Sequence, residues 1–378
     1  MSERLKKVLP EIPSPCFVLD EQLLVRNISI AKHIQEQAGV KILLALKGFS
    51  MYEEFPLMKP FIGGITASSL NEALLGFHEN KEKVHSCFPV YTDAQFEQVQ
   101  EISSHLTFNS ISQFEKFQSR LTPSKLKYAF RVNPEYSEVK TDLYNPCSPT
   151  SRLGIAHSEL EEQLPEEITG LHFHALCEND SHTLERTLNA FSDKYESYLQ
   201  QVSWVNFGGG HLFSSENYDV DHLIKVLKDF KTKHDVNIIM EPGSAHAWQT
   251  GYLVSSVQDI LYKGGRNIAM LDVSFTAHMP DCLEMPYKPN VIGEKEWGEH
   301  SYTFGGNSCL AGDQVSGFVF DKKLVMDQKI VFKDMMHYTM VKTSTFNGVD
   351  LPSIGVINQK GEFKLKKTFG YEDYRRRL

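Results

Sequence analysis

The segment Lys41–Lys47, KILLALK, is a short apolar run that ends on a lysine, and it is the first of eight similar runs. The other seven are Gly63–Ala67, Val84–Val90, His105–Asn109, Leu126–Val132, Ile168–His174, Ser203–Phe207 and Asn237–Glu241. Most of the segments between them have the length of a helix and carry apolar residues at positions i, i+3 and i+4. This alternation of strand and helix predicts an α/β fold, a TIM-like (β/α)8 barrel, over residues 21–245.

Several of these runs close on residues that can do chemistry. Lys47 ends the first run, His174 ends the sixth, the triple glycine 208–210 follows the seventh and Glu241 ends the eighth. In a barrel of this kind the C-terminal ends of the strands face the active site. The sequence therefore predicts that an amine, an imidazole, a glycine loop and a carboxylate converge on one mouth.

The pattern changes after Glu241, where short β-rich runs separated by turn residues replace the alternation. These runs are Gly251–Val257, Asn267–Val273, Val315–Val319, Lys329–Phe332 and Gly355–Ile357. They predict an antiparallel β domain. A further run, Cys16–Asp20, precedes the barrel and is expected to join the same sheet, so that residues 1–20 and 246–378 form one discontinuous domain.

Composition restricts the class of partner. The 378 residues include 39 Lys and Arg against 48 Asp and Glu, a net charge of −9, which argues against nucleic-acid binding and suits a cationic small molecule. The six cysteines show no CxxC spacing, so neither a disulfide framework nor a zinc knuckle is expected. The N-terminus lacks a signal-peptide core, and no apolar run approaches the ~18 residues that cross a bilayer. We therefore expect a cytoplasmic protein that binds no membrane.

Each chemical motif has a structural alternative. Burial of Lys47 would lower the pKa of its amine toward the range in which the free amine is a nucleophile, as an imine-forming lysine requires. The alternative is a lysine that reaches solvent from the strand end. His172 and His174 share one strand face because side chains alternate, so the pair could ligate a metal, or one ring could cover a planar ligand, or both could simply pack.

The glycine loop, Glu241 and the cysteine segment in the β domain also carry groups that can do chemistry. The N–H groups of the glycine loop can wrap a phosphate. Glu241 needs a cationic partner, which a protonated heterocyclic nitrogen or a barrel lysine or arginine would supply. Cys309 could donate a proton and Asp313 could anchor an amine, although a cysteine beside a turn commonly only packs.

In combination, the motifs resemble the pyridoxal-phosphate decarboxylases of the ornithine/diaminopimelate decarboxylase family, which has the alanine racemase-like fold. The matching segments occur in order along nearly the whole chain: LLALKG, FHAL, NFGGG, EPG, GGNSC and YT followed by STFNG. Within that family the chain most resembles the carboxynorspermidine/carboxyspermidine decarboxylases, on the segments LHFHALCEN, SRLG, AHMPDCLEMPY and SCLAGD.

The resemblance implies a role for each motif residue toward pyridoxal 5'-phosphate. Lys47 corresponds to the Schiff-base lysine, His174 to the residue that stacks on the ring, and Glu241 to the partner of the pyridine nitrogen. Arg152 is expected near the phenolic oxygen. Contacts to the phosphate are implied for Gly208, Gly209, Gly210, Gly243 and Tyr338. Cys309 would come from the second subunit of a homodimer and protonate the carbanion, so that the β domain contributes to both the dimer interface and the active site.

The implied reaction is decarboxylation of carboxynorspermidine and carboxyspermidine to norspermidine and spermidine in polyamine biosynthesis. The candidate carboxylates for the substrate's amines are Glu178, Asp272, Asp281, Glu284 and Asp313. Two departures bear on the site: Leu310 stands where ornithine enzymes carry an Asp, and Ser244 stands where they carry an Arg. Three alternatives remain: an ornithine, lysine or diaminopimelate decarboxylase, a metal-dependent barrel hydrolase that uses His172 and His174, and an inactive regulatory homologue.

Overall fold

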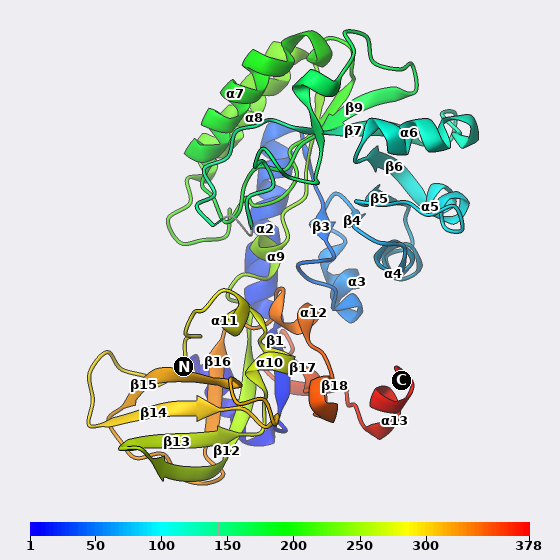
Figure 1. Ribbon diagram of the computed structural model, residues 1–378. Coiled ribbons are helices and arrows are strands. Elements are labelled where there is room, and N and C mark those ends of the chain that lie inside the picture. Colours follow the sequence, from blue (N-terminus) through cyan, green and yellow to red (C-terminus); the bar gives the residue numbers. More distant parts are fainter. Residues whose placement is uncertain (142–143) are drawn as a thin grey trace. The chain divides into compact units, whose positions relative to one another are not determined.

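The chain folds into two compact units. The computed structural model describes residues 1–141 and 144–378. Unit 1 comprises residues 1–24 and 247–378, and unit 2 comprises residues 25–246. Figure 1 labels the elements of both.

Unit 2 is built on a parallel sheet with the strand order β2-β11-β10-β9-β7-β6-β5-β4-β3, in which β8 also pairs with β7. The bounds of these strands are β2 Lys41–Ile42, β3 Leu44–Ala45, β4 Ile65–Ala67, β5 Val84–Cys87, β6 Ser103–Phe108, β7 Lys127–Asn133, β8 Ile155–Ala156, β9 Ile168–His172, β10 Trp204–Asn206 and β11 Asn237–Met240.

The first apolar run joins both edges of this sheet. It is interrupted at Leu43, whose N–H donates to the carbonyl of Met240 at 2.8 Å, while the N–H of Leu44 donates to Gly64 at 3.0 Å. Its first half, β2, therefore pairs with the last strand, and its second half, β3, pairs with β4. The predicted barrel is confirmed.

Helices follow most of the barrel strands. Their bounds are α2 Glu21–Ala38, η2 Tyr52–Glu54, α3 Phe55–Met58, α4 Leu70–Asn80, α5 Phe96–Ile102, α6 Ile111–Phe117, η3 Gln118–Arg120, η5 His157–Glu159, α7 Ser181–Leu199, α8 Val220–His234 and α9 Ser244–Ala247. The side chains of Asp180 and Asp219 cap α7 and α8 by accepting the N–H groups of Thr183 and His222. Between β7 and β9 the described residues form only β8 and η5, so the alternation is interrupted there.

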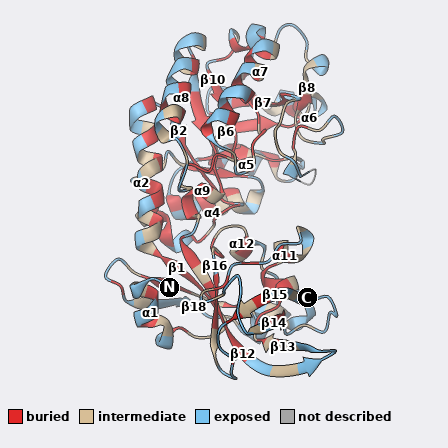
Figure 2. Ribbon diagram, turned by 90° about the vertical axis from the view of Figure 1, so that its left-hand side faces the viewer, coloured by how far each residue is buried: buried red, intermediate tan, exposed pale blue. Residues whose placement is uncertain are grey.

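The strands of unit 2 are buried, whereas the outer surfaces of its helices are exposed (Figure 2). Leu43, Ala129, Trp204 and Ile239 form one buried cluster from different strands of the barrel. The Trp204 ring lies against Gly170, where a Cβ atom would overlap the indole. Removing apolar surface from water in this way is the main source of stability for the barrel.

Unit 1 contains a second sheet with the order β15-β14-β13-β12-β1-β17-β18, in which β16 also pairs with β12. The bounds are β1 Cys16–Asp20, β12 Gly251–Lys263, β13 Arg266–Leu271, β14 His300–Gly305, β15 Gln314–Phe320, β16 Lys329–Lys333, β17 Ser353–Ile357 and β18 Phe363–Lys367. The expected pairing of Cys16–Asp20 with C-terminal strands is confirmed, because β1 lies between β12 and β17. The sheet is mixed rather than antiparallel throughout, since β1 is parallel to β17 and β13 is parallel to β14.

Short helices complete unit 1: α1 Glu3–Val8, η1 Leu9–Glu11, α10 Phe275–His278, α11 Asp281–Glu284, α12 Thr339–Lys342, η6 Phe346–Gly348 and α13 Tyr371–Arg375. All six cysteines lie in the described part of the chain and are free thiols. Among the described residues, no helix combines the length and the apolar character needed to span a bilayer.

Candidate active site

Lys47 lies just beyond β3, at the end of the strand run that joins the two edges of the barrel. Lys47 is exposed, yet many protein atoms surround its amine. Desolvation lowers the pKa of its amine below the usual value of 10.5; the charge of Arg131 lowers it further, and that of Glu241 opposes this. A lowered pKa increases the fraction of neutral, nucleophilic amine at neutral pH.

His174 follows β9 and contacts the glycine loop. Its Nδ1 accepts the N–H of Gly209 at 2.8 Å, so the neutral ring carries its proton on Nε2. Desolvation, followed by the charges of Lys47 and Arg131, holds the pKa of this imidazole well below 6.5. The ring is therefore neutral and fixed in orientation, as a surface for stacking on a planar ligand should be.

The triple glycine after β10 is packed too tightly for side chains. A Cβ atom on Gly208 would lie 2.8 Å from Nδ1 of His174, and one on Gly209 would lie 2.6 Å from the carbonyl oxygen of Glu241. Gly208 and Gly210 also have positive φ angles of 64° and 88°. Glycine is therefore required. Side chains hold two of the loop's N–H groups, since that of Gly208 donates to Asn206 and that of Gly209 donates to His174.

Gly210→Ala is expected to lower the free energy of unfolding by about 1–2 kcal/mol for the positive φ and by a further ~1–3 kcal/mol for overpacking, because the new Cβ would overlap the carbonyl of Leu176. Gly265→Ala is the matched control, since Gly265 has a φ of +76° but a Cβ atom added there would meet nothing within 4 Å. Urea denaturation of both variants measures the difference. Equal losses of stability would show that packing around Gly210 does not constrain the loop.

Glu241 directly follows β11, the last barrel strand, and its carboxylate is buried. It accepts a hydrogen bond from Nδ2 of Asn206 at 2.7 Å and another from Thr66. Burial raises the pKa of this carboxyl above 4.5, while those two hydrogen bonds and the charges of Lys47 and Arg131 oppose the increase. Nε2 of His172 lies 3.8 Å from the carboxylate, but desolvation holds the pKa of His172 well below 6.5, so the neighbour is neutral.

Asn206 connects the carboxylate to the glycine loop. Its Oδ1 accepts the N–H of Gly208 at 2.9 Å while its amide donates to Glu241. The side chain is buried and both ends of its amide are used. Asn206 thus fixes the carboxylate relative to the loop, a positioning role that the predicted site did not include.

Arg131 is a second residue missing from the prediction. It lies in β7, two residues before the strand end, and its charge affects the pKa values of Lys47, His174 and Glu241. A hydrogen bond from Arg131 also lowers the pKa of the Cys87 thiol, against the larger opposing effect of burial. The available signal was a charged residue inside the apolar run Leu126–Val132, which the prediction did not use.

Arg152 and Glu178 belong to loops of unit 2. Arg152 is exposed, and its carbonyl oxygen accepts a hydrogen bond from Nδ2 of Asn109 at 2.9 Å. Glu178 is exposed in the loop after β9, with a φ of 53°. Their expected contacts, with the phenolic oxygen and the substrate respectively, remain predictions.

Within unit 1, Cys309 lies on an exposed loop that two polar residues organise. Its N–H donates to Oδ1 of Asn347 at 2.7 Å, which ties the SCLAGD and STFNG motifs together. Asp313, predicted to anchor an amine, is buried and accepts hydrogen bonds from the Ser308 hydroxyl at 2.6 Å and the Thr276 N–H at 3.0 Å. These bonds give Asp313 a structural task in shaping the cysteine loop.

The other predicted acidic residues of unit 1 fall into two groups. Asp272 accepts hydrogen bonds from the hydroxyls of Ser14 at 2.6 Å and Ser255 at 2.7 Å. Asp281 and Glu284 lie on α11 and both pair with the ammonium of Lys342, at 2.9 Å for Glu284. The α11 pair therefore already holds one primary ammonium group.

Tyr338 directly precedes α12 and has a φ of 44°. Positive φ is uncommon for a residue with a side chain and is concentrated at functional sites. The expected contact of Tyr338 with phosphate remains a prediction, as does that of Gly243, whose Cα would lie 2.6 Å from a Cβ atom on Gly48.

The HxH pair does not form part of a larger ligand set. Among the described residues, the group of at least three His, Cys, Asp or Glu side chains close enough to share a metal ion lies on α7 and α8 and includes neither His172 nor His174. Since barrel hydrolases need further ligands beside such a pair, this arrangement does not favour the hydrolase alternative.

The chain is similar to known decarboxylases over nearly its whole length. No family profile matches the chain. It is 48% identical, over 98% of its length and 96% of the relative, to carboxyaminopropylagmatine decarboxylase from Synechocystis sp.. It is 40% identical, over 96% of its length and 98% of the relative, to carboxynorspermidine/carboxyspermidine decarboxylase from Campylobacter jejuni.

Solved structures agree with this relationship. The crystal structure of carboxynorspermidine decarboxylase complexed with norspermidine from Campylobacter jejuni superposes with a TM-score of 0.91 at 38% identity, over 97% of this chain and 100% of that chain. A diaminopimelate decarboxylase superposes with a TM-score of 0.81 at 18% identity, over 98% of this chain and 94% of that chain, which shows a shared fold.

Proposed function

Because the chain belongs to the carboxynorspermidine/carboxyspermidine decarboxylase family, we propose that it releases carbon dioxide from carboxynorspermidine and carboxyspermidine, forming norspermidine and spermidine in polyamine biosynthesis. The enzyme is a carboxy-lyase. The observation that carries the proposal is identity at 40% over nearly the whole of both chains, combined with a lysine, an imidazole and a buried carboxylate at the ends of barrel strands.

We infer that the cofactor is pyridoxal 5'-phosphate, and the residues of unit 2 fit it. Lys47 offers an amine of lowered pKa for the aldehyde, and His174 offers a neutral ring for stacking. The glycine loop has no Cβ atoms and would let a phosphate approach its backbone closely. When bound, this cofactor accepts the electron pair left by the departing carboxylate.

The residues of the chain then have distinct tasks. Lys47 would hold the cofactor covalently through its aldehyde, and Glu241 would keep the pyridine nitrogen protonated through a charge-assisted hydrogen bond. Asn206 holds that carboxylate in position. Gly243 and Tyr338 join the glycine loop in binding phosphate, and Cys309 of the partner subunit returns a proton to the α-carbon of the substrate.

The substrate's distal amines need carboxylates, and the α11 pair is the best supported subsite. Asp281 and Glu284 together bind the ammonium of Lys342, so a substrate ammonium could replace it with the same charge-assisted bonds. Asp272 and Asp313 already accept several hydrogen bonds within unit 1. We therefore assign substrate binding to Asp281 and Glu284 before the other candidate carboxylates.

Carbon dioxide release from a panel of amino acids tests this function. Carboxynorspermidine or carboxyspermidine is expected to exceed ornithine, lysine and meso-diaminopimelate in kcat/KM by at least ~100-fold. Ornithine and lysine offer a single amine at the end of a shorter chain, and meso-diaminopimelate brings a second carboxylate that the acidic residues Asp281 and Glu284 would repel. Preference for any of those three amino acids would contradict the proposal.

A second candidate substrate is favoured by one specific observation. The relative at 48% identity is named for carboxyaminopropylagmatine, so this compound belongs in the same panel. If its kcat/KM exceeds those of carboxynorspermidine and carboxyspermidine, the substrate assignment changes while the reaction stays the same.

We also propose that the active enzyme is a homodimer with shared sites. If Lys47 and Cys309 come from different subunits, mixing Lys47→Ala with Cys309→Ala protein should recover about a quarter of the wild-type sites under random pairing. Mixing Lys47→Ala with Glu241→Gln is the matched control and should recover none, since both residues belong to unit 2 of the same chain. Failure of the first mixture to recover activity would contradict the shared site.

We further propose a cytoplasmic location, which suits the six free thiols. The net charge of −9 supports a cationic small molecule rather than nucleic acid as the partner.

A further inference from the structure

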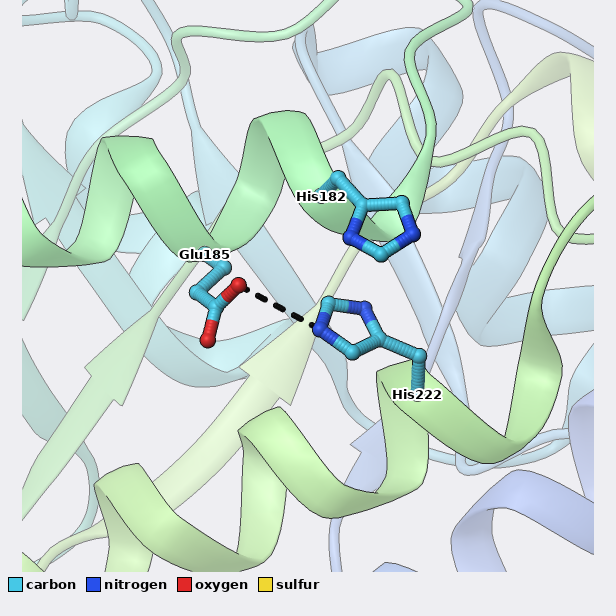
Figure 3. A group of neighbouring side chains, drawn as sticks. All are labelled: His182, Glu185 and His222. Atoms are coloured by element: carbon cyan, nitrogen blue, oxygen red, sulfur yellow. Dashed lines mark ion pairs between the residues drawn. The ribbon is translucent and has the colours of Figure 1, made fainter.

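Three side chains that the decarboxylase does not use meet between α7 and α8. His182 and Glu185 lie three residues apart on the first turns of α7, and His222 lies on the first turn of α8 (Figure 3). Each offers one ligand atom, and these atoms lie within 4.8 Å of one another. Within residues 1–141 and 144–378, no other group of three His, Cys, Asp or Glu side chains meets this condition.

The hydrogen bonds of His222 direct one ring nitrogen toward the carboxylate. Nδ1 lies 3.0 Å from the hydroxyl of Ser181, which is fully buried, and Nε2 lies 3.3 Å from Oε2 of Glu185. When Nδ1 donates to Ser181, the lone pair of Nε2 faces the carboxylate. Two electron-rich groups in this arrangement need a cation between them, which is either a proton or a metal ion.

We propose that His182, Glu185 and His222 bind a divalent transition-metal ion, for which zinc is the probe. Two imidazoles and a carboxylate form a ligand set suited to this class of metal, and the outward orientation leaves room for water as a further ligand. The Ser181 hydroxyl supplies the outer hydrogen bond that fixes the tautomer of a metal-bound histidine.

The present orientation of His182 requires one adjustment. Its ring stacks on that of His222, with centroids 4.0 Å apart and an interplanar angle of 28°. The lone pairs of two stacked rings point in nearly parallel directions and not toward one ion. His182 must therefore change rotamer to bind the same metal as His222. Its side chain is exposed, and exposed side chains change rotamer rapidly.

A metal at this position would connect two loops of the barrel. α7 follows the loop that carries His174, and α8 follows the loop that carries the triple glycine. These loops already pair through the N–H of Asn179, which donates to Gly210 at 2.9 Å, and the N–H of Leu212, which donates to Asn179 at 3.3 Å. The ion would brace the two helices just beyond this pairing, so its role is structural, and it does not depend on the proposed decarboxylation.

Zinc titration of the full-length, tag-free holoenzyme by calorimetry tests the site. We expect one ion per chain and a rise in Tm on binding, because a ligand that binds only the folded state stabilises it. His182→Ala and Glu185→Gln should each weaken binding by at least ~10-fold, and Ser181→Ala by roughly 10-fold through its outer hydrogen bond. His78→Ala, which removes an exposed histidine of α4 in the same unit, should change nothing.

A spectroscopic measurement keeps the test decisive if a variant is unstable. Copper(II) bound to the wild-type protein should show two nitrogen ligands by electron paramagnetic resonance, and His182→Ala should reduce this to one. Unchanged zinc affinity in both His182→Ala and Glu185→Gln, or no binding of zinc or copper to the wild type, would overturn the site. In that case a proton links Glu185 and His222 as an ordinary ion pair, and the proposed decarboxylase function is unaffected.

Discussion

Lys47→Ala is expected to lower kcat for carbon dioxide release by at least ~10³-fold, because the variant lacks the amine that we propose binds the cofactor covalently and is exchanged for the substrate's amine. Borohydride reduction of the wild-type holoenzyme, followed by peptide mass mapping, should label Lys47. Lys41→Ala is the matched control, since Lys41 is an exposed lysine in the same run. We expect the control to retain activity and labelling.

The lowered pKa of Lys47 gives this prediction a pH dependence. Desolvation lowers that pKa from 10.5, so the neutral amine becomes available at a pH below the one at which a free lysine would lose its proton. The rate at which the apoenzyme takes up pyridoxal phosphate should therefore rise with pH and level off below pH 10.5. Labelling of another lysine, or a rate that still rises above pH 10.5, would contradict the assigned role of Lys47.

Glu241→Gln is expected to affect activity and stability in opposite directions. Kcat should fall by ~10²–10³-fold, because a neutral amide cannot hold a proton on the pyridine nitrogen by charge. The apoenzyme should become more stable, since burial raises the pKa of Glu241 and the ionised form is costly in the empty site. Urea denaturation and steady-state kinetics measure the two effects. Glu79→Gln, which changes an exposed residue of α4, is the control.

The sign of the pH effect follows from proton linkage. With its raised pKa, Glu241 keeps its proton in the folded state at pH values at which the unfolded chain has lost it. The folded state then binds more protons, so wild-type apoenzyme stability should decrease as pH rises from about 4.5 through the raised pKa. Glu241→Gln should lack this decrease. A variant less stable than the wild type at pH 7 would show that the ionised carboxylate is stabilising.

Much of the barrel was predictable because its strands are buried on both faces. Continuous apolar runs such as Asn237–Glu241 identify strands of a parallel sheet, and all eight runs contain strand residues. Cys16–Asp20 was also placed correctly, since this apolar run has the length of a strand and lies outside the barrel.

The second sheet was less predictable. The parallel pairing of β1 with β17 has no signature in periodicity, because a buried strand reads the same in either direction. β18 was missed because FKLKK is an exposed edge strand whose lysines protect it from further pairing. β14 was missed because the segment HSYTFG mixes polar and aromatic residues and so lacks a continuous apolar run. It also lies beside the glycine turn.

The site shows a similar limit. Lys47 and Glu241 were selected because a charged residue that ends an apolar strand is conspicuous. Asp313 was selected on the same charge, but its hydrogen bonds come from Ser308 and from the backbone of Thr276, a residue 37 positions away. The sequence alone does not show such hydrogen-bond partners. A carboxylate that shapes a loop therefore cannot be distinguished in it from one that binds substrate. Arg131 was overlooked because it lies inside the run Leu126–Val132 and not at its end.

The interrupted first strand has a consequence for how the chain is made. The segment that precedes Lys47 leaves the ribosome long before β11, yet β2 must wait for β11 to complete its hydrogen bonds. With roughly 200 residues between them and synthesis at about 5–20 residues per second, the delay is on the order of 10–40 s. Until then the nascent sheet has two open edges, which makes this interval the period of greatest exposure to aggregation. Any truncation before residue 237 would remove β11, so the strand run that leads to Lys47 could not complete the barrel.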